Sequence, residues 1–195
     1  MPQRKLIVQE FVSLDGLAAG PNDDVSFVPA SMQGDQRFGR EQVALVNECD
    51  TLVLGRVTYQ MFKGYWPGVV KEGDEKVFAD KFNGLSKVVF SATLDRAPWG
   101  AWPEARVVRR SPSDEVTELK QEPGKDIFVS GSISIAQALL RANLIDEFRL
   151  VLCPVVLGSG KKLFDRVPEA QLTLLDVNRM DRGAVLLRYG VHVKR

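Results

Sequence analysis

The sequence has very few residues of the kinds that build disulfides, metal sites or nucleophilic triads: two cysteines and one histidine among 195 residues. Cys49 and Cys153 lie far apart, each among apolar neighbours, so we interpret them as small buried hydrophobic residues. His192 alone cannot support a histidine-rich metal site, and no G-x-S-x-G segment supplies a serine to pair with it. The sequence therefore predicts no metal site and no serine or cysteine nucleophile.

Net charge and long hydrophobic runs are also lacking. The formal net charge is +1 and the basic residues occur in short pairs, which argues against a nucleic-acid partner. The N-terminal apolar run, residues 6–14, is too short and too polar for a signal peptide, and no run is long enough to span a membrane. We therefore expect a cytoplasmic protein without a membrane partner. The absence of a G-x-G-x-x-G fingerprint and of a P-loop disfavours a classical dinucleotide fold and an NTPase.

What the chain does contain is an alternation of strand-like and helix-like segments. A hydrophobic fraction of 45% is enough for a core, and we expect residues 1–195 to form a single domain. Expected strands cover residues 6–11, 51–54, 87–90, 106–108, 127–129, 147–153, 171–177 and 184–193. Expected helices cover 35–48, 56–63, 75–82 and 113–120, with one more after residue 132, while residues 17–34 are expected to form a long loop. This order predicts an α/β fold, a mixed and mostly parallel sheet with helices on both faces.

Three strand-to-helix junctions carry small or hydroxyl-bearing residues. Gly55 ends a strand and is followed by Arg56 and Thr58, a pattern typical either of a phosphate seat at a helix N-terminus or of an ordinary turn. The second junction has Gly131 and Ser132, where Ser132 is either an N-cap or part of a phosphate site. The third junction has Ser91 and Thr93, whose hydroxyls fit a ribose or phosphate contact or plain turn chemistry, the latter being favoured in isolation. Parallel strands would bring these junctions to one edge of the sheet.

Four further residues are candidates for substrate chemistry. Asp15 starts the long loop and is a candidate acid, although Asp15-Gly16 is also a good turn. Tyr65 and Trp66 could stack on a planar ring, with packing as the alternative. Lys161 follows Gly158-Ser159-Gly160 and could meet a substrate phosphate, or the loop could be purely structural.

A set of short motifs occurs along nearly the whole chain in a specific order. They are Ser13-Leu14-Asp15-Gly16, Leu54-Gly55-Arg56 with Thr58-Tyr59, Tyr65-Trp66-Pro67, Phe78-Ala79-Asp80 with Asn83, Lys87-Val88-Val89-Phe90-Ser91 with Thr93-Leu94, Ser130-Gly131-Ser132, Leu144-Ile145-Asp146-Glu147-Phe148, and Pro154-Val155-Val156-Leu157-Gly158-Ser159-Gly160 with Leu163-Phe164. Together these motifs resemble the dihydrofolate reductase-like superfamily, and more closely its bacterial RibD C-terminal, riboflavin-biosynthesis reductase branch.

The resemblance implies a three-layer fold with a mostly parallel eight-stranded sheet, and NADPH as the hydride donor. By position, Gly55, Arg56 and Thr58 would hold the pyrophosphate and 2′-phosphate. The adenosine half would lie along Ser91, Thr93 and Leu94, and the nicotinamide ribose and pyrophosphate would meet Gly131, Ser132 and Ile133. The loop after Asp15 would cover the nicotinamide.

The resemblance also implies an activity, a substrate class and a partner. The expected function is an NADPH-dependent reduction of a small heterocyclic substrate, a pyrimidine resembling 5-amino-6-(5-phosphoribosylamino)uracil or a pteridine, by a homodimer. A stand-alone dihydrofolate or pteridine reductase is one alternative, but Asp35, Glu41 and Glu48 do not match the spacing expected of its helix carboxylate. A non-catalytic NADP(H)-binding module is the other. The absence of a fused C-x-x-C segment excludes zinc-dependent deamination by this chain.

Overall fold

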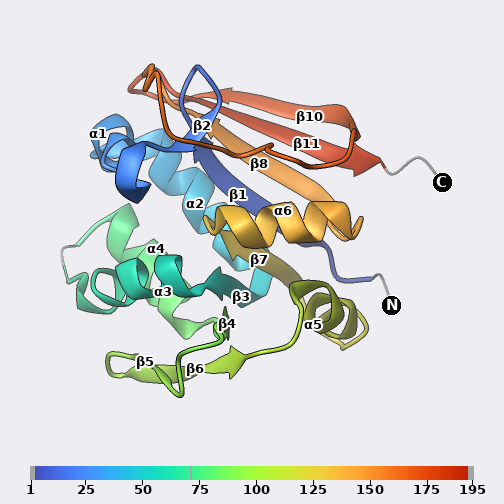
Figure 1. Cartoon of the computed structure of the whole chain (residues 1–195). Helices are drawn as coiled ribbons and strands as arrows, with labels where there is room; N and C mark the ends of the chain where they lie inside the picture. Colours follow the sequence, from blue (N-terminus) through green and yellow to red (C-terminus); the bar gives the residue numbers. More distant parts are fainter. Residues whose placement is uncertain (1–2, 71, 193–195) are drawn as a thin grey trace.

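The computed structural model describes residues 3–70 and 72–192, and within those ranges nine strands form the main sheet (Figure 1). Their order is β10-β11-β8-β1-β7-β3-β4-β6-β5. The central strands run parallel, which confirms the mixed, mostly parallel sheet, and their loops therefore gather at one edge, which we term the carboxyl edge. The parallel strands are β8 (Glu147–Leu152), β1 (Leu6–Val12), β7 (Asp126–Ser130), β3 (Cys49–Gly55), β4 (Ser86–Phe90) and β6 (Trp102–Val108).

Antiparallel strands close both sides of the sheet. β10 (Gln171–Arg179) and β11 (Val185–His192) form the hairpin predicted around residues 181–183, and β11 pairs with β8. On the other side β5 (Ala97–Trp99) pairs with β6. The expected count of eight strands was wrong because β5 has only three residues with Pro98 at its centre. A proline lacks the N–H of a ladder, but an edge strand tolerates it.

Helices cover both faces, as predicted. Alternate residues of β1 belong to different buried clusters, since Leu6 and Val8 pack with α5 (Pro112–Leu119) and α6 (Ile133–Arg141). Ile7 packs on the opposite face with α2 (Gln36–Glu48), α3 (Arg56–Lys63) and α4 (Asp74–Gly84). Figure 1 shows α6 crossing the first of these faces. The two faces of β1 therefore meet different helices, which decides where each of its polar residues points.

The expected long loop at residues 17–34 contains regular structure, so that prediction was wrong. It holds β2 (Leu17–Ala19), a 3-10 turn η1 (Pro21–Asp23) and α1 (Phe27–Met32), and β2 pairs with β9 (Lys161–Lys162). Both short strands depend on a partner more than 140 positions away in the chain, which local sequence patterns do not reveal. α1 is held by tertiary packing of Phe27 and Met32 against the end of β8.

The two cysteines lie in the interior as predicted. Both are free, and burial raises the pKa of the Cys49 thiol to about 12 and that of Cys153 to about 11. Thiols with such pKa values stay protonated at neutral pH and are poor nucleophiles. Separately, none of the helices within residues 3–70 and 72–192 is long and apolar enough to cross a membrane.

Candidate active site

The first two strand-to-helix junctions touch each other at the carboxyl edge. β3 and β7 are neighbours, so Gly55 and Gly131 end adjacent strands. The backbone N–H of Gly55 donates a hydrogen bond to the Ser132 hydroxyl, with N and Oγ 2.9 Å apart. Ser132 occupies the N-cap position of α6 with a left-handed backbone (φ 69°), yet its side chain makes no capping bond to the helix. Its hydroxyl therefore connects the two junctions, a role that neither sequence interpretation included.

The glycines allow this close contact. A Cβ on Gly55 would lie 3.4 Å from Ile135, and a Cβ on Gly131 would lie 3.3 Å from Thr58, while the backbone of Gly131 has a positive φ of 59°. Gly55 is the N-cap residue of α3 and provides no side-chain cap either. Two helix N-termini with uncapped first-turn N–H groups thus begin side by side. Their dipoles and amides favour a bound anion.

Arg56 adds a mobile positive charge beside this pair of helix starts. It is exposed on the first turn of α3, and its Nη1 reaches only the Gln60 side chain, at 3.2 Å, in the same helix. Thr58, two residues on, is buried against Gly131. The structure thus brings together five of the predicted cofactor residues: Gly55, Arg56, Thr58, Gly131 and Ser132. Ile133 follows directly as the first residue of α6.

The third junction has the geometry of a hydroxyl-stabilised turn. The Ser91 Oγ accepts hydrogen bonds from the N–H groups of Thr93 (3.2 Å) and Leu94 (3.0 Å). The Leu94 carbonyl in turn accepts from Arg109 Nη2 at 2.9 Å, and the same nitrogen pairs with Asp95. The turn interpretation therefore accounts for Ser91, while the exposed Thr93, whose hydroxyl lies 3.5 Å from the Ser91 Oγ, remains a predicted adenosine contact. Arg109 was not among the predicted site residues, although its position directly after β6 places it at the carboxyl edge.

Asp15 joins two loops. Its carboxylate accepts hydrogen bonds from the N–H groups of Leu157 (3.1 Å) and Gly158 (2.7 Å). A hydrogen bond from Ser13 and these two backbone bonds lower the pKa of Asp15 to about 2. A carboxyl group with that pKa has no proton to give at neutral pH. Its role as the acid stays a prediction, and one that these hydrogen bonds do not favour.

Lys161 lies in β9, where it pairs with Ala19 and forms an ion pair with Asp23. Gly160 packs so tightly on β2 that a Cβ would lie 2.0 Å from the Ala19 carbonyl oxygen. The Gly158–Gly160 loop therefore serves at least to seat β9 on β2. Contact of Lys161 with a substrate phosphate stays a prediction.

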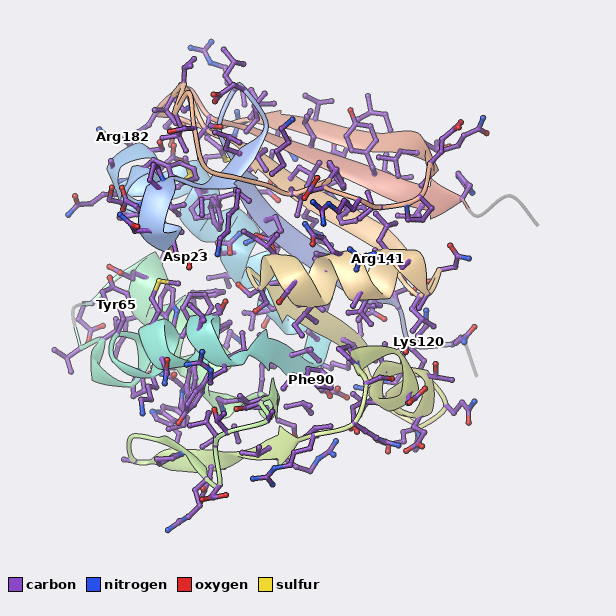
Figure 2. All side chains as sticks on the ribbon, viewed as in Figure 1. Asp23, Tyr65, Phe90, Lys120, Arg141 and Arg182 are labelled. Atoms are coloured by element: carbon purple, nitrogen blue, oxygen red, sulfur yellow. The ribbon has the colours of Figure 1, made fainter. Side chains whose placement is uncertain are left out.

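Tyr65 and Trp66 differ in their surroundings. Trp66, in the 3-10 turn η2 (Trp66–Gly68), packs its ring 5.0 Å from that of Phe78 and 5.4 Å from that of Phe82, which fits the packing alternative. Tyr65 is 53% exposed, and a hydrogen bond to Glu75 raises its pKa to about 12. The Tyr65 ring also packs edge-on against Trp66, with centroids 5.0 Å apart, and ring stacking on a ligand stays a prediction. Figure 2 shows Tyr65, Asp23 and Arg182 at the end of the molecule toward which the parallel strands point, with Lys120 and Arg141 at the opposite end.

An open pocket of about 350 Å³ lies at the carboxyl edge, lined by Phe27, Ala30 and Ser31 of α1, by Pro154 and Val155, and by Arg182. A second hollow of about 740 Å³ lies by the opposite ends of β3 and β4, among ion-paired residues such as Arg4, Asp50 and Glu115. The smaller pocket adjoins the segment that contains Asp15, because the Leu14 N–H donates a hydrogen bond to the carbonyl of its lining residue Val155. Arg182 gives it a positive charge that the sequence interpretation did not identify.

Comparison with known proteins identifies the family. The sequence profile of the RibD C-terminal domain matches residues 4–186. The chain belongs to the RibD C-terminal domain family. The Bacillus subtilis (strain 168) protein YyaP is 31% identical over 190 residues, which make up 97% of this chain and 96% of YyaP.

Solved structures of other proteins share this RibD C-terminal fold. A Shewanella sp. PV-4 protein assigned to riboflavin biosynthesis superposes with a TM-score of 0.74 at 21% identity, covering 97% of this chain and 99% of that one. The Thermotoga maritima diaminohydroxyphosphoribosylaminopyrimidine deaminase/5-amino-6-(5-phosphoribosylamino)uracil reductase gives a TM-score of 0.64 at 13% identity, covering 97% of this chain and 57% of that one. These likenesses confirm the predicted fold class.

Within this RibD C-terminal fold, two of the three carboxylates considered for the helix, Asp35 and Glu48, lie at the two ends of α2 and bind other groups. Asp35 accepts hydrogen bonds from the N–H groups of Phe38 and Arg182, and Glu48 pairs with Arg149. The buried α2 residue facing β1 is Gln42, whose amide exchanges two hydrogen bonds with Gln9, at 2.8 and 2.9 Å. An amide pair, and not a carboxylate, thus connects this part of α2 to β1.

Sequence reasoning missed Glu10, which it used only to mark the N-terminal run as polar. Glu10 is buried in β1 with 3% of its surface exposed, and its Oε1 has no hydrogen-bond partner in the part of the chain that the structure describes. Burial raises its pKa to about 8, so the carboxyl is protonated at neutral pH. The available signal was an acidic residue inside a strand otherwise expected to be buried.

Proposed function

We propose that this protein is an NADPH-dependent reductase of a small heterocyclic substrate. The observation that carries the proposal is the pair of uncapped helix N-termini, α3 and α6, connected by the bond from the Gly55 N–H to the Ser132 hydroxyl. Two converging helix starts with glycine at each junction suit a pyrophosphate, which carries two negative charges close together. Membership of the RibD C-terminal family, whose member in RibD is a reductase domain, supports the same assignment.

The residues at the junctions fit the parts of NADPH. Gly55 and Gly131 let the two helix starts lie against each other, so that one pyrophosphate would meet both, and the exposed Arg56, whose side chain bonds to Gln60 of its own helix, would reach the 2′-phosphate. The exposed Thr93 and the adjoining Arg109 border the place of the adenosine half. NADPH supplies a hydride when bound. The protein's part is to hold donor and acceptor close together and to exclude water, which is where most of the acceleration of such a step arises.

A phosphorylated pyrimidine is the substrate class we propose. The solved RibD-like reductase named above acts, by its name, on 5-amino-6-(5-phosphoribosylamino)uracil. In this chain the exposed part of the Tyr65 ring would stack on a pyrimidine, and Arg182 and Lys161 are cations at the same end of the molecule. Dihydrofolate is less well matched because Gln42, rather than a carboxylate, faces β1.

A titration of the purified protein with NADPH and NADH, followed by nicotinamide fluorescence, tests the proposal first. We expect saturable NADPH binding with weaker NADH binding, and then NADPH oxidation with a phosphoribosylaminopyrimidine. Cofactor binding without turnover of any pyrimidine or pteridine would identify a non-catalytic module instead. Absence of binding at millimolar cofactor would refute the reductase assignment.

Replacing Arg56 is expected to separate the two cofactors. Arg56→Ala removes the cation proposed to read the 2′-phosphate, so NADPH affinity is expected to fall about tenfold to a hundredfold, the usual worth of a charge-assisted hydrogen bond. NADH affinity is expected to change less than about threefold. Arg141→Ala, at the opposite end of the molecule, is the control (Figure 2). Equal losses for both cofactors would show that Arg56 does not recognise the 2′-phosphate.

We also propose that the chain forms a homodimer through β10. Leu172, Leu174 and Val177 of this edge strand are 38%, 51% and 50% exposed. Their partners across the ladder, Val191, Tyr189 and Leu187, are partly buried, so the apolar surface continues onto β11. An apolar edge strand of this length readily pairs with a second copy of itself.

Leu174→Arg is expected to convert the dimer into a monomer, because the charge would lie at the centre of the apolar face. Size-exclusion chromatography with light scattering measures the mass. Thr173→Arg, on the other face of the same strand, is the matched control and is expected to remain dimeric. A monomeric wild type, or a Leu174→Arg variant of unchanged mass, would exclude this interface.

A further inference from the structure

Glu10 lies on the face of β1 that α6 covers. Its neighbours two positions away, Val8 and Val12, belong to the buried cluster that includes α6, whereas Ile7 belongs to the cluster on the other face. The strand register pairs Glu10 with Leu150 of β8. The carboxyl group therefore points into an apolar layer between β1 and α6.

Among the residues that the structure describes, none forms an ion pair with Glu10, and burial alone accounts for its raised pKa. The charged residue nearest in β8, Arg149, lies on the opposite face, where it pairs with Glu48 and Glu147. The hydrophobic cluster on this face includes Val129 of β7, Leu150 of β8, Ile135 and Ala136 of α6, Ala18 of β2, and Leu163 after β9. By contrast, the buried Glu115 and Glu147 each pair with two arginines. An unpaired buried carboxyl group costs stability, and such groups are concentrated at functional sites.

Glu10 also adjoins the proposed cofactor site at the starts of α3 and α6 (Gly55, Arg56, Gly131 and Ser132), which we term the cofactor cradle. The Gly131 N–H donates to the Gln9 carbonyl at 3.0 Å, and Gln9 pairs with Ser130 in the parallel ladder. The next residue along each strand is Glu10 on β1 and Gly131 on β7, which places their backbones about one strand spacing apart, roughly 4.8 Å. Gly131 has no side chain to separate them. The carboxyl group is thus beside the junction at which α6 begins.

We infer that Glu10 is the acid of the reduction, holding in its protonated form the proton that the substrate takes up. This assignment rests on the proposed reductase function. The reaction consumes one hydride and one proton: the hydride from NADPH adds to an electrophilic ring or imine carbon, and the electron pair of the broken double bond moves onto the adjoining nitrogen or oxygen. That atom forms a bond to the Glu10 proton, which leaves NADP⁺, the reduced substrate and a carboxylate. Solvent returns a proton to Glu10 after product release.

Access to Glu10 requires movement of the cover formed by β2 and β9. These strands are joined by the two pairs Leu17–Lys162 and Ala19–Lys161, and Ala18 and Leu163 pack into the same cluster as Val12. β1 shares four pairs with β7 and six with β8. Separating β2 and β9 breaks fewer strand pairs than separating β1 from its neighbours, so it costs less free energy. We expect this cover to close again over bound ligands and exclude water.

Glu10→Gln tests the assignment, since it preserves shape and removes the acidic proton. The wild type is assayed first for NADPH affinity and for kcat between pH 6 and pH 10. We expect kcat to fall above a pKa of about 8 in the wild type. In Glu10→Gln we expect NADPH affinity within about twofold, kcat lowered about 10²- to 10⁴-fold, and no fall near that pH. Glu10→Asp is expected to recover part of the rate, and Glu118→Gln, exposed on α5, is the control.

The outcomes separate the two proposals. A wild type that turns over no heterocycle refutes the reductase function and this role of Glu10 together. A wild type that is active, with Glu10→Gln retaining both its rate and its pH profile, overturns only the assignment of Glu10. Loss of rate together with loss of NADPH binding would show that Glu10 supports the cofactor cradle and would also overturn its role as the acid.

Discussion

Between pH 4.5 and pH 8 the free energy of unfolding of the wild type is expected to fall relative to that of Glu10→Gln, by as much as about 5 kcal/mol. The pKa of Glu10 is about 8 in the folded protein against 4.5 for an unperturbed glutamate, a difference of 8 − 4.5 = 3.5 units. In that window the unfolded chain releases the proton that the folded chain retains, so the unfolded state becomes relatively more stable as pH rises. The loss is complete above pH 8, and below pH 4.5 the contribution is zero.

Urea unfolding of both proteins at intervals from pH 4 to pH 9 measures this difference. All other titrating groups are shared, so they cancel in the comparison. Glu10→Leu, which also lacks the proton, is the control and is expected to follow the profile of Glu10→Gln. Parallel stability curves for the wild type and Glu10→Gln would show that Glu10 is solvated or paired in solution, and the inference about its acidity would then fail with it.

Gly160→Ala is expected to detach β9 from β2 without unfolding the rest of the protein. The new Cβ would lie 2.0 Å from the Ala19 carbonyl oxygen and 2.9 Å from the Gly20 Cα, both backbone atoms that cannot rotate away, and φ at this position is +147°. Overpacking of this kind costs about 3 kcal/mol, which corresponds to roughly a hundredfold faster opening of the cover. Because we expect this cover to close over bound ligands and exclude water, we expect a parallel loss of turnover.

Hydrogen exchange of residues 17–20 and 161–162 measures the opening, with β1 and β7 as internal references. Gly158→Ala is the matched control: it also has a positive φ of 73°, but no atom lies within 4 Å of its added Cβ. We expect it to cost only the backbone strain of about 1 kcal/mol and to leave the β2–β9 pairing protected. Equal protection in both variants would contradict the structural role given to Gly160.

Local patterns were sufficient for the central part of the fold. The apolar run of β3 followed by Gly55 and the 3.6-residue periodicity of α2 predicted those elements nearly to their ends. Ser91, Gly131 and Ser132 followed strands, so their common position at the carboxyl edge follows from the parallel order alone. Local patterns did not predict β2, β5, β9 and α1, because the stability of β2, β9 and α1 depends on partners that are remote in the sequence and β5 has only three residues.

The sequence by itself determined the alternation of strands and helices, the family, and the set of residues at the helix starts. Only the tertiary structure decided how those residues are used. Ser132 bonds to Gly55 instead of capping α6, because the junctions of adjacent strands come within hydrogen-bond distance. The pKa of Asp15, a candidate acid from the sequence, is lowered by hydrogen bonds from Ser13 and from the N–H groups of a segment more than 140 positions away, whereas burial raises the pKa of Glu10. Proton affinity depends on solvation and on neighbours in space, and those exist only once the chain has folded.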